Sequence, residues 1–248
     1  MTKLKPLCRL FTTLFVFRYP KMKRLINICT FVLGVFFLCN FMGSCNRYPP
    51  VSGTTFHETF ITHYIVPEQF SVSDSGGKIT LHTRGDVIGS GVVFDTLSRF
   101  YNDVSYNAWV WYGPTRAILG EIKSIKLETI EAFDECHLAG SDISDLVELQ
   151  YISYYDFVQN GYSEEEPKIR EDYEDMSEYF GREGAKIYKV KLSEIDYSAM
   201  KLVATDFLLK FLSLPKFHSA PIEGSVYRFR LTFQTQNNRI ETLIEHEF

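Results

Sequence analysis

Aspartate and glutamate are absent from the first 44 residues of this chain, although the whole sequence of 248 residues contains 31 of them. Seven of the 26 lysines and arginines lie in the same stretch, which leaves 19 basic against 31 acidic residues in 45–248. The excess of acidic residues in 45–248 argues against nucleic-acid binding, because the affinity of proteins for nucleic acids comes mainly from basic side chains that neutralise phosphates. It argues equally against docking on a membrane through a polybasic surface.

The sequence also lacks the short motifs that would identify a reaction. It has no His-Glu-x-x-His, no nucleophile elbow and no phosphate loop, since we expect no helix after the glycines of 85–91. None of the six histidines has metal-ligand spacing with another. Asp134, Cys136, His137 and Asp142 are close in sequence, but a turn there needs such groups as caps and hydrogen-bond partners. We therefore predict no catalytic residue, no cofactor and no metal ligand.

What the N-terminal part does contain is an export signal. Lys23 and Arg24 precede an uncharged apolar run, 25–43, which ends in small residues just before Cys45. A basic start, an apolar middle and small residues at the cut are the parts of a secretory signal. The sequence FMGSC at 41–45 resembles the lipobox of bacterial lipoproteins, which implies cleavage before Cys45 and a lipid on its thiol. The alternative is an uncleaved transmembrane helix, since about 20 apolar residues can span a bilayer.

The signal divides the chain into parts. Residues 1–44 are the N-terminal extension and signal peptide, with the signal proper at 22–44, and we expect translation to begin at Met22. Residues 45–55 form a tether and 56–248 form the folded domain. After cleavage only Cys45 and Cys136 remain. Because Cys45 carries lipid, no intrachain disulfide is expected, and we predict that Cys136 is a small buried residue.

Strand-like segments dominate 56–248. Apolar and polar residues alternate most clearly in 227–233, and 239–248 returns as its partner after an asparagine turn. The segment 206–214 is apolar on both faces, which indicates a central strand. Further strands are expected at 56–66, 79–83, 91–97, 107–112, 121–130 and 186–192. Short strands separated by turn residues indicate a sandwich or barrel, so we predict a mainly β fold.

The segment 142–184 differs, because it shows little alternation. We predict an insertion or long crossover with one or two short helices, the first capped by Asp142. Its aromatic residues lie among many acids and include Tyr154, Tyr155, Tyr162, Tyr173 and Tyr179. Tyrosine suits interfaces and sugar faces, so these five side chains are a candidate recognition surface for a glycan or a cationic protein. The alternative is that the rings pack the insertion onto the sheets while the acids stay solvated.

The stretch 122–134 (IKSIKLETIEAFD), followed by HLAGSDI at 137–143, resembles uncharacterised lipoproteins of the Bacteroides group. The resemblance implies a lipid-anchored, immunoglobulin-like antiparallel sandwich without catalytic residues. We expect a non-enzymatic binding or structural protein of the cell envelope, with a glycan or an envelope protein as partner. No acid follows Cys45 in 46–50, which favours the outer membrane and a periplasmic orientation over the cell surface. The alternatives are an enzyme acting on envelope glycans or peptides, and a fimbrial or adhesin-type subunit.

Overall fold

The computed structural model describes residues 54–75, 77–110, 115–164, 166–217, 220–221 and 226–248, which belong to one compact unit. The signal and Cys45 lie outside these residues. The described part of the protein is mainly β, with 46% of its residues in strands and 17% in helices, so the predicted fold class is confirmed at this level. Among the described helices, none has the length and hydrophobicity needed to cross a bilayer.

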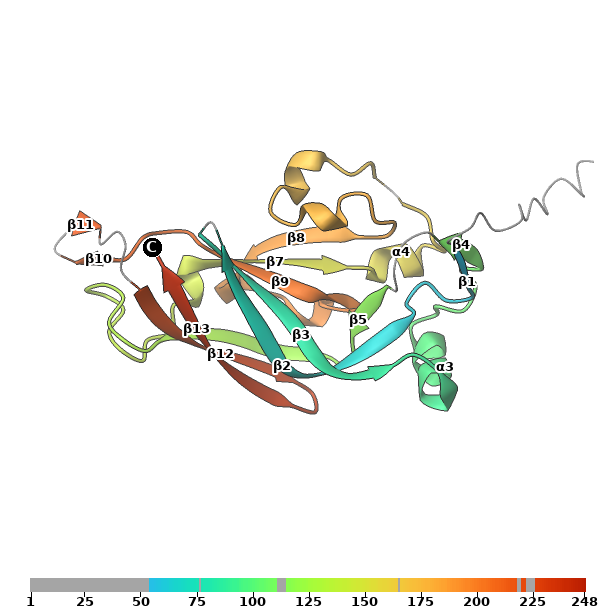
Figure 1. Ribbon diagram of the computed structural model, residues 1–248, viewed down its shortest axis with the longest axis horizontal. Coiled ribbons are helices and arrows are strands. Elements are labelled where there is room, and N and C mark those ends of the chain that lie inside the picture. The colour runs from blue at the N-terminus through green and yellow to red at the C-terminus, as the bar shows by residue number, and fades with distance from the viewer. Residues whose placement is uncertain (1–53, 76, 111–114, 165, 218–219, 222–225) are drawn as a thin grey trace, which may run out of the picture. The chain divides into compact units, whose positions relative to one another are not determined.

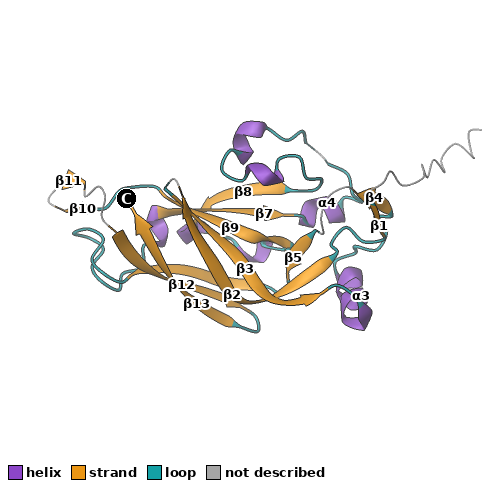
Figure 2. Cartoon of the chain, viewed as in Figure 1, coloured by secondary structure: helices purple, strands orange, loops and turns teal. Residues whose placement is uncertain are grey.

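Two sheets form the framework of the domain (Figures 1 and 2). The larger sheet has the strand order β5-β2-β3-β9-β7-β8, and the smaller sheet has the order β13-β12-β6. Their strands are β2 (His63–Ser75), β3 (Lys78–Ile88), β5 (Arg116–Ile118), β6 (Ile122–Thr129), β7 (Val147–Ser153), β8 (Lys186–Lys191), β9 (Val203–Phe211), β12 (Val226–Thr235) and β13 (Arg239–Glu247). Two further pairs are β1 (Thr55–His57) with β4 (Ala108–Val110), and β10 (Lys216–Phe217) with β11 (Ala220–Pro221).

All of these pairs are antiparallel except β2 with β5, which run parallel. This pair departs from the wholly antiparallel arrangement expected from the sequence. Parallel neighbours require a long crossover, because the chain must return to the end of the sheet at which it started. Here the return includes β3, the helix α3 (Gly91–Phe100) and β4.

The facing sides of the two sheets enclose one hydrophobic core. Alternate residues of β12, namely Tyr227, Phe229, Leu231 and Phe233, are buried in it. Phe233 contacts Phe70 of β2 and Phe207 of β9, with ring centroids 5.0 and 5.6 Å apart. The intervening Arg228 is exposed. The predicted hairpin at the C-terminal end, with one buried face and one wet face, is therefore confirmed.

The opposite face of the larger sheet is also covered. Against it lie α3, the short helix α4 (Tyr155–Gln159) and the 3-10 turns η2 (Arg170–Tyr173) and η3 (Ser177–Tyr179), which enclose a second core. In β9, Phe207 and Leu209 face the first core, whereas Ala204 and Leu208 face the second. This confirms the prediction of a central strand that is apolar on both faces, although it lies at 203–211 rather than 206–214, and Leu212 and Leu214 are exposed. The remaining 3-10 turns are η1 (Ser144–Leu146), η4 (Leu192–Glu194) and η5 (Tyr197–Ala199).

Two predicted strands are wrong. The segment 91–97 is not a strand but most of α3, which starts at Gly91 with φ of +85°. A helix therefore does follow the glycines of 85–91. The segment 56–66 is not continuous, because β1 ends at His57 and β2 begins at His63. Of the segment 107–112, only Ala108–Val110 is a described strand, and Trp111 lies outside the described residues.

The predicted insertion at 142–184 is also corrected. It contains β7, which lies between β8 and β9 inside the larger sheet. Only the part after Ser153, up to residue 184, is added to the sheet, and we call it the added segment. The strand was missed because it is buried on both faces and therefore shows no alternation. Cys136 is exposed rather than buried, since it lies in a surface turn. Asp142 is not the N-cap of η1, since that position is Ile143, but its Oδ1 does accept the backbone N–H of Ser144 at 2.9 Å.

Candidate functional site

A groove of about 390 Å³ lies on the second face of the larger sheet, between β3, β5 and β9 and the added segment. We call it the arginine groove. The polar and charged side chains on which the argument depends are His82, Arg84, Arg116, Tyr179, Arg182 and Asp206. The groove takes these residues from four parts of the chain, which the sheet order brings together.

The register of β3 with β9 forms the centre of the groove. His82 and Asp206 are direct partners across these strands, and His82 Nδ1 lies 2.9 Å from Asp206 Oδ1. Their neighbours Leu81 and Phe207 are buried between the two sheets. Because successive side chains of a strand point to opposite faces, His82 and Asp206 are directed away from that core. Their side chains are 42% and 22% exposed, so the pair is open to a ligand.

Asp206 is held from a second side by the added segment. Its Oδ2 accepts a hydrogen bond of 2.5 Å from the Tyr179 hydroxyl. Burial raises the pKa of Tyr179, and the negative charge of Asp206 raises it further, so this hydroxyl stays a donor at neutral pH. With Nδ1 of His82 directed at the carboxylate, its Nε2 is the ring nitrogen left for a ligand.

Three guanidinium groups give the groove its positive charge. Arg84 follows His82 by two residues on β3, Arg116 begins β5, and Arg182 follows η3. Within the part of the chain that the structure describes, none of the three forms an ion pair with a carboxylate. Among the described residues that line the groove, Asp206 provides the one carboxylate, so three positive groups face one negative group. The groove is therefore positive on a domain that is acidic as a whole.

Arg84 and Arg182 are each held by a hydrogen bond from Nε, which leaves their other N–H donors without a partner among the described residues. Arg84 Nε donates to Ser71 Oγ at 3.4 Å, and Arg182 Nε donates to the Glu178 carbonyl at 3.1 Å. The Arg182 guanidinium also lies 5.1 Å from the centre of the Tyr179 ring. A planar guanidinium held through Nε or stacked on a ring keeps its two terminal nitrogens for a carboxylate or phosphate.

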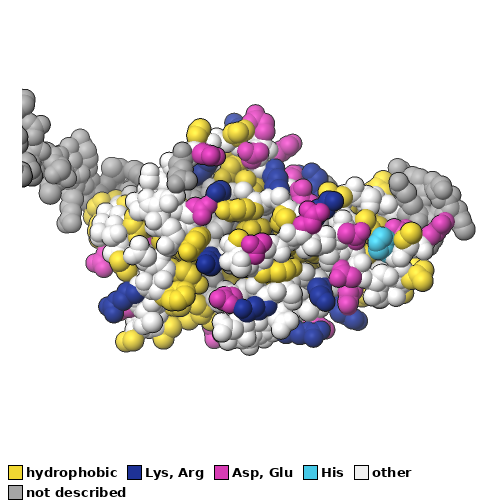
Figure 3. Space-filling view, turned by 180° about the vertical axis from the view of Figure 1, so that it is seen from behind, with side chains coloured by type: hydrophobic (Ala, Val, Ile, Leu, Met, Phe, Trp, Pro, Cys, Tyr) yellow, Lys and Arg dark blue, Asp and Glu magenta, His cyan; other side chains and the backbone are white. Residues whose placement is uncertain are grey.

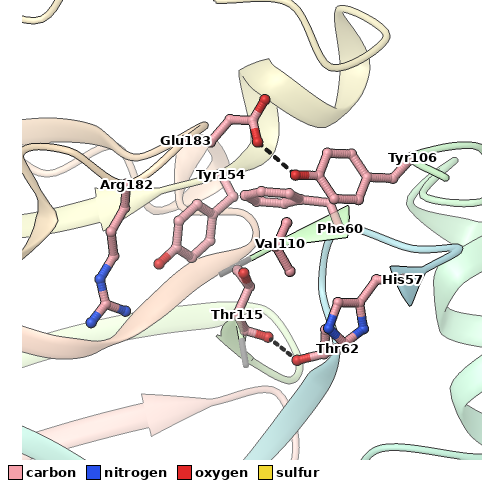
Figure 4. A pocket seen from close by; sticks show the side chains of 9 residues that line it. All are labelled: His57, Phe60, Thr62, Tyr106, Val110, Thr115, Tyr154, Arg182 and Glu183. Carbon is pink, nitrogen blue, oxygen red and sulfur yellow. Dashed lines mark hydrogen bonds between the residues drawn. The ribbon is translucent and has the colours of Figure 1, made fainter. Parts of the chain in front are cut away.

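A second and much smaller pocket adjoins the groove at Tyr154 and Arg182, which line both (Figure 4). Its volume is about 30 Å³, which is room for a water molecule and for little else. Tyr106 donates a 2.5 Å hydrogen bond to Glu183 Oε2 on its wall, and Thr62 Oγ1 donates to the Thr115 carbonyl at 3.0 Å. This pocket is therefore too small for a ligand of the size that the arginine groove admits.

The five tyrosines predicted as a recognition surface do not form one. Tyr154, Tyr173 and Tyr179 are at most 4% exposed, and Tyr155 and Tyr162 are half-buried against the same second core. Their large rings pack the added segment onto the sheet, which is the arrangement that the alternative predicted. Tyr154 and Tyr179 still border the arginine groove.

The turn around His137 has the expected structural role. Asp134 Oδ1 accepts the backbone N–H groups of Cys136 and His137 at 2.8 and 2.7 Å, and His137 Nδ1 lies 2.9 Å from the same oxygen. Among the described residues, no group of three histidine, cysteine or acidic side chains could hold a metal ion. The lipidation residue predicted from the sequence, Cys45, is outside the described residues.

Sequence reasoning missed the arginine groove, although one signal for it was present. Asp206 interrupts the apolar sequence of β9, VATDFLLKF, in the middle of a covered sheet. An acid at such a position needs a partner, because an unpaired buried charge is costly. The chain as a whole matches no protein-family model, no curated protein and no solved structure.

Proposed function

We propose that this protein is a lipid-anchored component of the bacterial cell envelope whose β domain binds an anionic ligand in the arginine groove. The observation that carries the proposal is the convergence of Arg84, Arg116 and Arg182 on one groove without carboxylate partners among the described residues. Like charges that line one groove repel one another, and a ligand of opposite charge removes that repulsion.

The chemistry of the groove favours a carboxylate or phosphate group on an envelope glycan. Guanidinium groups bind both anions through pairs of parallel hydrogen bonds, and His82 adds one further nitrogen. A volume of about 390 Å³ accommodates a sugar unit or two rather than a whole polymer. The glycan was the partner expected for the tyrosines, and the proposal moves it to the arginine groove.

Binding can be tested with the full chain in detergent, titrated with inorganic phosphate, acetate and a galacturonic acid oligosaccharide and followed by calorimetry. Arg116→Gln should weaken binding of the acidic oligosaccharide by about tenfold or more, because a hydrogen bond to a charged group is lost. Arg228→Gln is the matched control, since this exposed arginine lies on the smaller sheet. Equal affinity of wild type and Arg116→Gln for all three probes would refute the assignment.

The anchor has its own test. Cys45→Ala should move the protein from the detergent phase to the aqueous phase when membranes are partitioned, because two or more acyl chains are what hold a lipoprotein. Cys136→Ala is the control, since Cys136 is exposed and belongs to the folded domain. Retention of Cys45→Ala in the detergent phase with residues 22–44 still attached would support the transmembrane alternative instead.

Hydrolysis is the second candidate function, and one observation favours it. A histidine whose Nδ1 faces a carboxylate has the arrangement of a general base, and Nε2 of His82 faces the groove in which the arginines would hold an anionic substrate. Release of reducing sugar from acidic envelope glycans by the wild type, lost in His82→Asn, would establish an enzyme. Binding that survives His82→Asn without any turnover supports the binding function.

The fold supports a binding protein better than a fimbrial subunit. β13 pairs with β12 over nine residues, and its Ile240 and Ile244 are buried in the first core, so the C-terminal strand is integral to the domain.

The immunoglobulin-like sandwich stays a prediction. Sandwiches of that kind are antiparallel, so the parallel pair of β5 with β2 would be an exception within one. A periplasmic orientation at the outer membrane also stays a prediction, which protease treatment of intact cells would test.

A further inference from the structure

Helix α3 carries apolar side chains on two faces, and only one of them is covered. Phe94 and Leu97 pack against the second core. Val92, Val93 and Phe100 are 81, 58 and 77% exposed, which is unusual for large apolar side chains that lie close together. We call these three residues the outer stripe.

Helical geometry makes the outer stripe continuous. At 3.6 residues per turn, Val92, Thr96, Phe100 and Val93 fall within an arc of about 100°. Thr96 does not interrupt the stripe, because its hydroxyl donates to the Val92 carbonyl at 2.7 Å. Val104, which is 50% exposed, follows the end of the helix. Figure 3 shows hydrophobic side chains at the end of the domain where α3 lies, seen from behind.

The outer stripe lies at the end of the domain where the described chain begins. Phe56 and His57 of β1 line a cleft together with Phe94, Ser98 and Arg99 of α3. Figure 1 shows β1 and α3 at this same end. Cys45 precedes Thr55 by ten residues, which span at most about 35 Å even when fully extended. A lipid on Cys45 therefore keeps α3 within reach of the bilayer surface.

We propose that the outer stripe of α3 inserts into the interface of the membrane to which Cys45 is attached. The inference rests on the lipid anchor of the proposed function and adds a second, noncovalent membrane contact. Three apolar side chains bind a bilayer weakly by themselves, but the tether holds them at a high local concentration of lipid. The contact fixes which end of the domain faces the bilayer.

The chemistry of the surface indicates apolar burial rather than attraction to anionic headgroups. Asp95 and Arg99, both exposed on α3, carry opposite charges, and the domain is acidic as a whole. Binding through the outer stripe should therefore be insensitive to salt and should not require anionic lipid. Two other occupants are a second copy of this chain and the segment 45–53 that remains after cleavage.

The test uses the lipidated chain in phosphatidylcholine vesicles, with Cys136→Ser to remove the exposed thiol. A bimane label on Phe100→Cys should be quenched at least about twofold more by a spin-labelled lipid than the same label on Leu243→Cys. Leu243 is the matched control because it is 56% exposed on the smaller sheet. Quenching at Phe100→Cys should be the same in low and high salt.

Flotation of the vesicles separates the possible failures. A protein that does not float with the vesicles refutes the anchor, and with it this inference. A protein that floats while both labels are quenched equally, or not at all, refutes the insertion of α3 alone. In detergent without lipid, burial of the label at Phe100→Cys that rises with protein concentration assigns the stripe to a second copy. Burial that is independent of concentration assigns it to the segment 45–53 of the same chain, and either result overturns the inference.

Discussion

The Tyr179 hydroxyl lies 2.5 Å from Asp206 Oδ2, so the segment added after β7 is tied directly to the central strand of the larger sheet. The other oxygen of the same carboxylate faces His82. Tyr179 thus holds the added segment in place and fixes the carboxylate on which the orientation of His82 depends.

Replacement of Tyr179 by phenylalanine separates these two roles. Tyr179→Phe keeps the buried ring but removes the donor, so we expect a loss of about 1 kcal/mol in the free energy of unfolding. Tyr179→Ala removes a ring that is 3% exposed and should cost about 3–5 kcal/mol. Urea unfolding measures both, and equal losses in the two variants would mean that the hydrogen bond, rather than the ring, holds the segment.

Asp175 makes the stability of the domain depend on pH. Its carboxylate forms an ion pair with Lys78, accepts a hydrogen bond from Gln150 Nε2 at 3.0 Å and lies 3.5 Å from Lys210 Nζ. Burial alone would raise the pKa of Asp175, but these three donors outweigh burial and lower the pKa to about 2.

The sign of this dependence follows from the lowered pKa. The carboxylate is held more strongly in the folded chain, so its contribution is fully present above about pH 4 and is lost as the pH falls toward 2. We expect a loss of up to about 2 kcal/mol over that range, measured by urea unfolding at each pH. Asp175→Asn should flatten the profile, whereas the exposed Asp86→Asn should not. An unchanged profile in Asp175→Asn would contradict the assignment.

Asp103 supplies hydrogen-bond acceptors to the backbone of the connection between β1 and β2. It is fully buried, and its two oxygens accept the backbone N–H groups of Phe60 and Ile61, each at 2.8 Å. Asp103→Ala leaves both donors without a partner and should cost about 3 kcal/mol, measured by thermal or urea unfolding. Asp103→Asn keeps one acceptor oxygen and should cost less. A loss in Asp103→Asn as large as that in Asp103→Ala would show that the charge matters more than the acceptors.

β12 offers a test of the two faces of the smaller sheet. Phe229 is fully buried in the first core, so Phe229→Asp should unfold the domain, because an unpaired buried carboxylate costs several kcal/mol. The neighbouring Arg228 is exposed, with its Nε 3.5 Å from Glu131 Oε1. Arg228→Asp loses this surface pair and should cost about 1 kcal/mol or less. Circular dichroism and the melting temperature distinguish the outcomes, and equal damage would contradict the faces seen in the structure.

The parts of the fold that were predicted correctly are those in which local pattern and tertiary contact agree. β12 alternates because one face is buried, and β9 is apolar throughout because both faces are. The segment 91–97 failed because Val92 and Val93 favour a strand, whereas Phe94 and Leu97 pack on the second core only when the segment is helical. Local preference was overridden there by a contact that the sequence does not show.

The site could not be predicted in the same way. His82 and Asp206 are 124 positions apart and meet only because β9 pairs with β3, a register that no local pattern encodes. Arg116 reaches the groove through the parallel pairing of β5 with β2, which the sequence did not indicate. The predicted anchor is the opposite case, because the resemblance to a lipobox depends only on consecutive residues, and its test is biochemical.

The pairing of β3 with β9 also has a consequence for the order in which the arginine groove forms. β3 is complete at Ile88, but its second neighbour in the sheet, β9, begins only at Val203. Contacts between segments so far apart in sequence form slowly, since a long loop must close before they stabilise the chain. A growing chain in which β9 has not yet appeared therefore has no arginine groove. If the groove binds the proposed ligand, that binding reports completed folding, and a fragment that ends before Val203 should bind nothing.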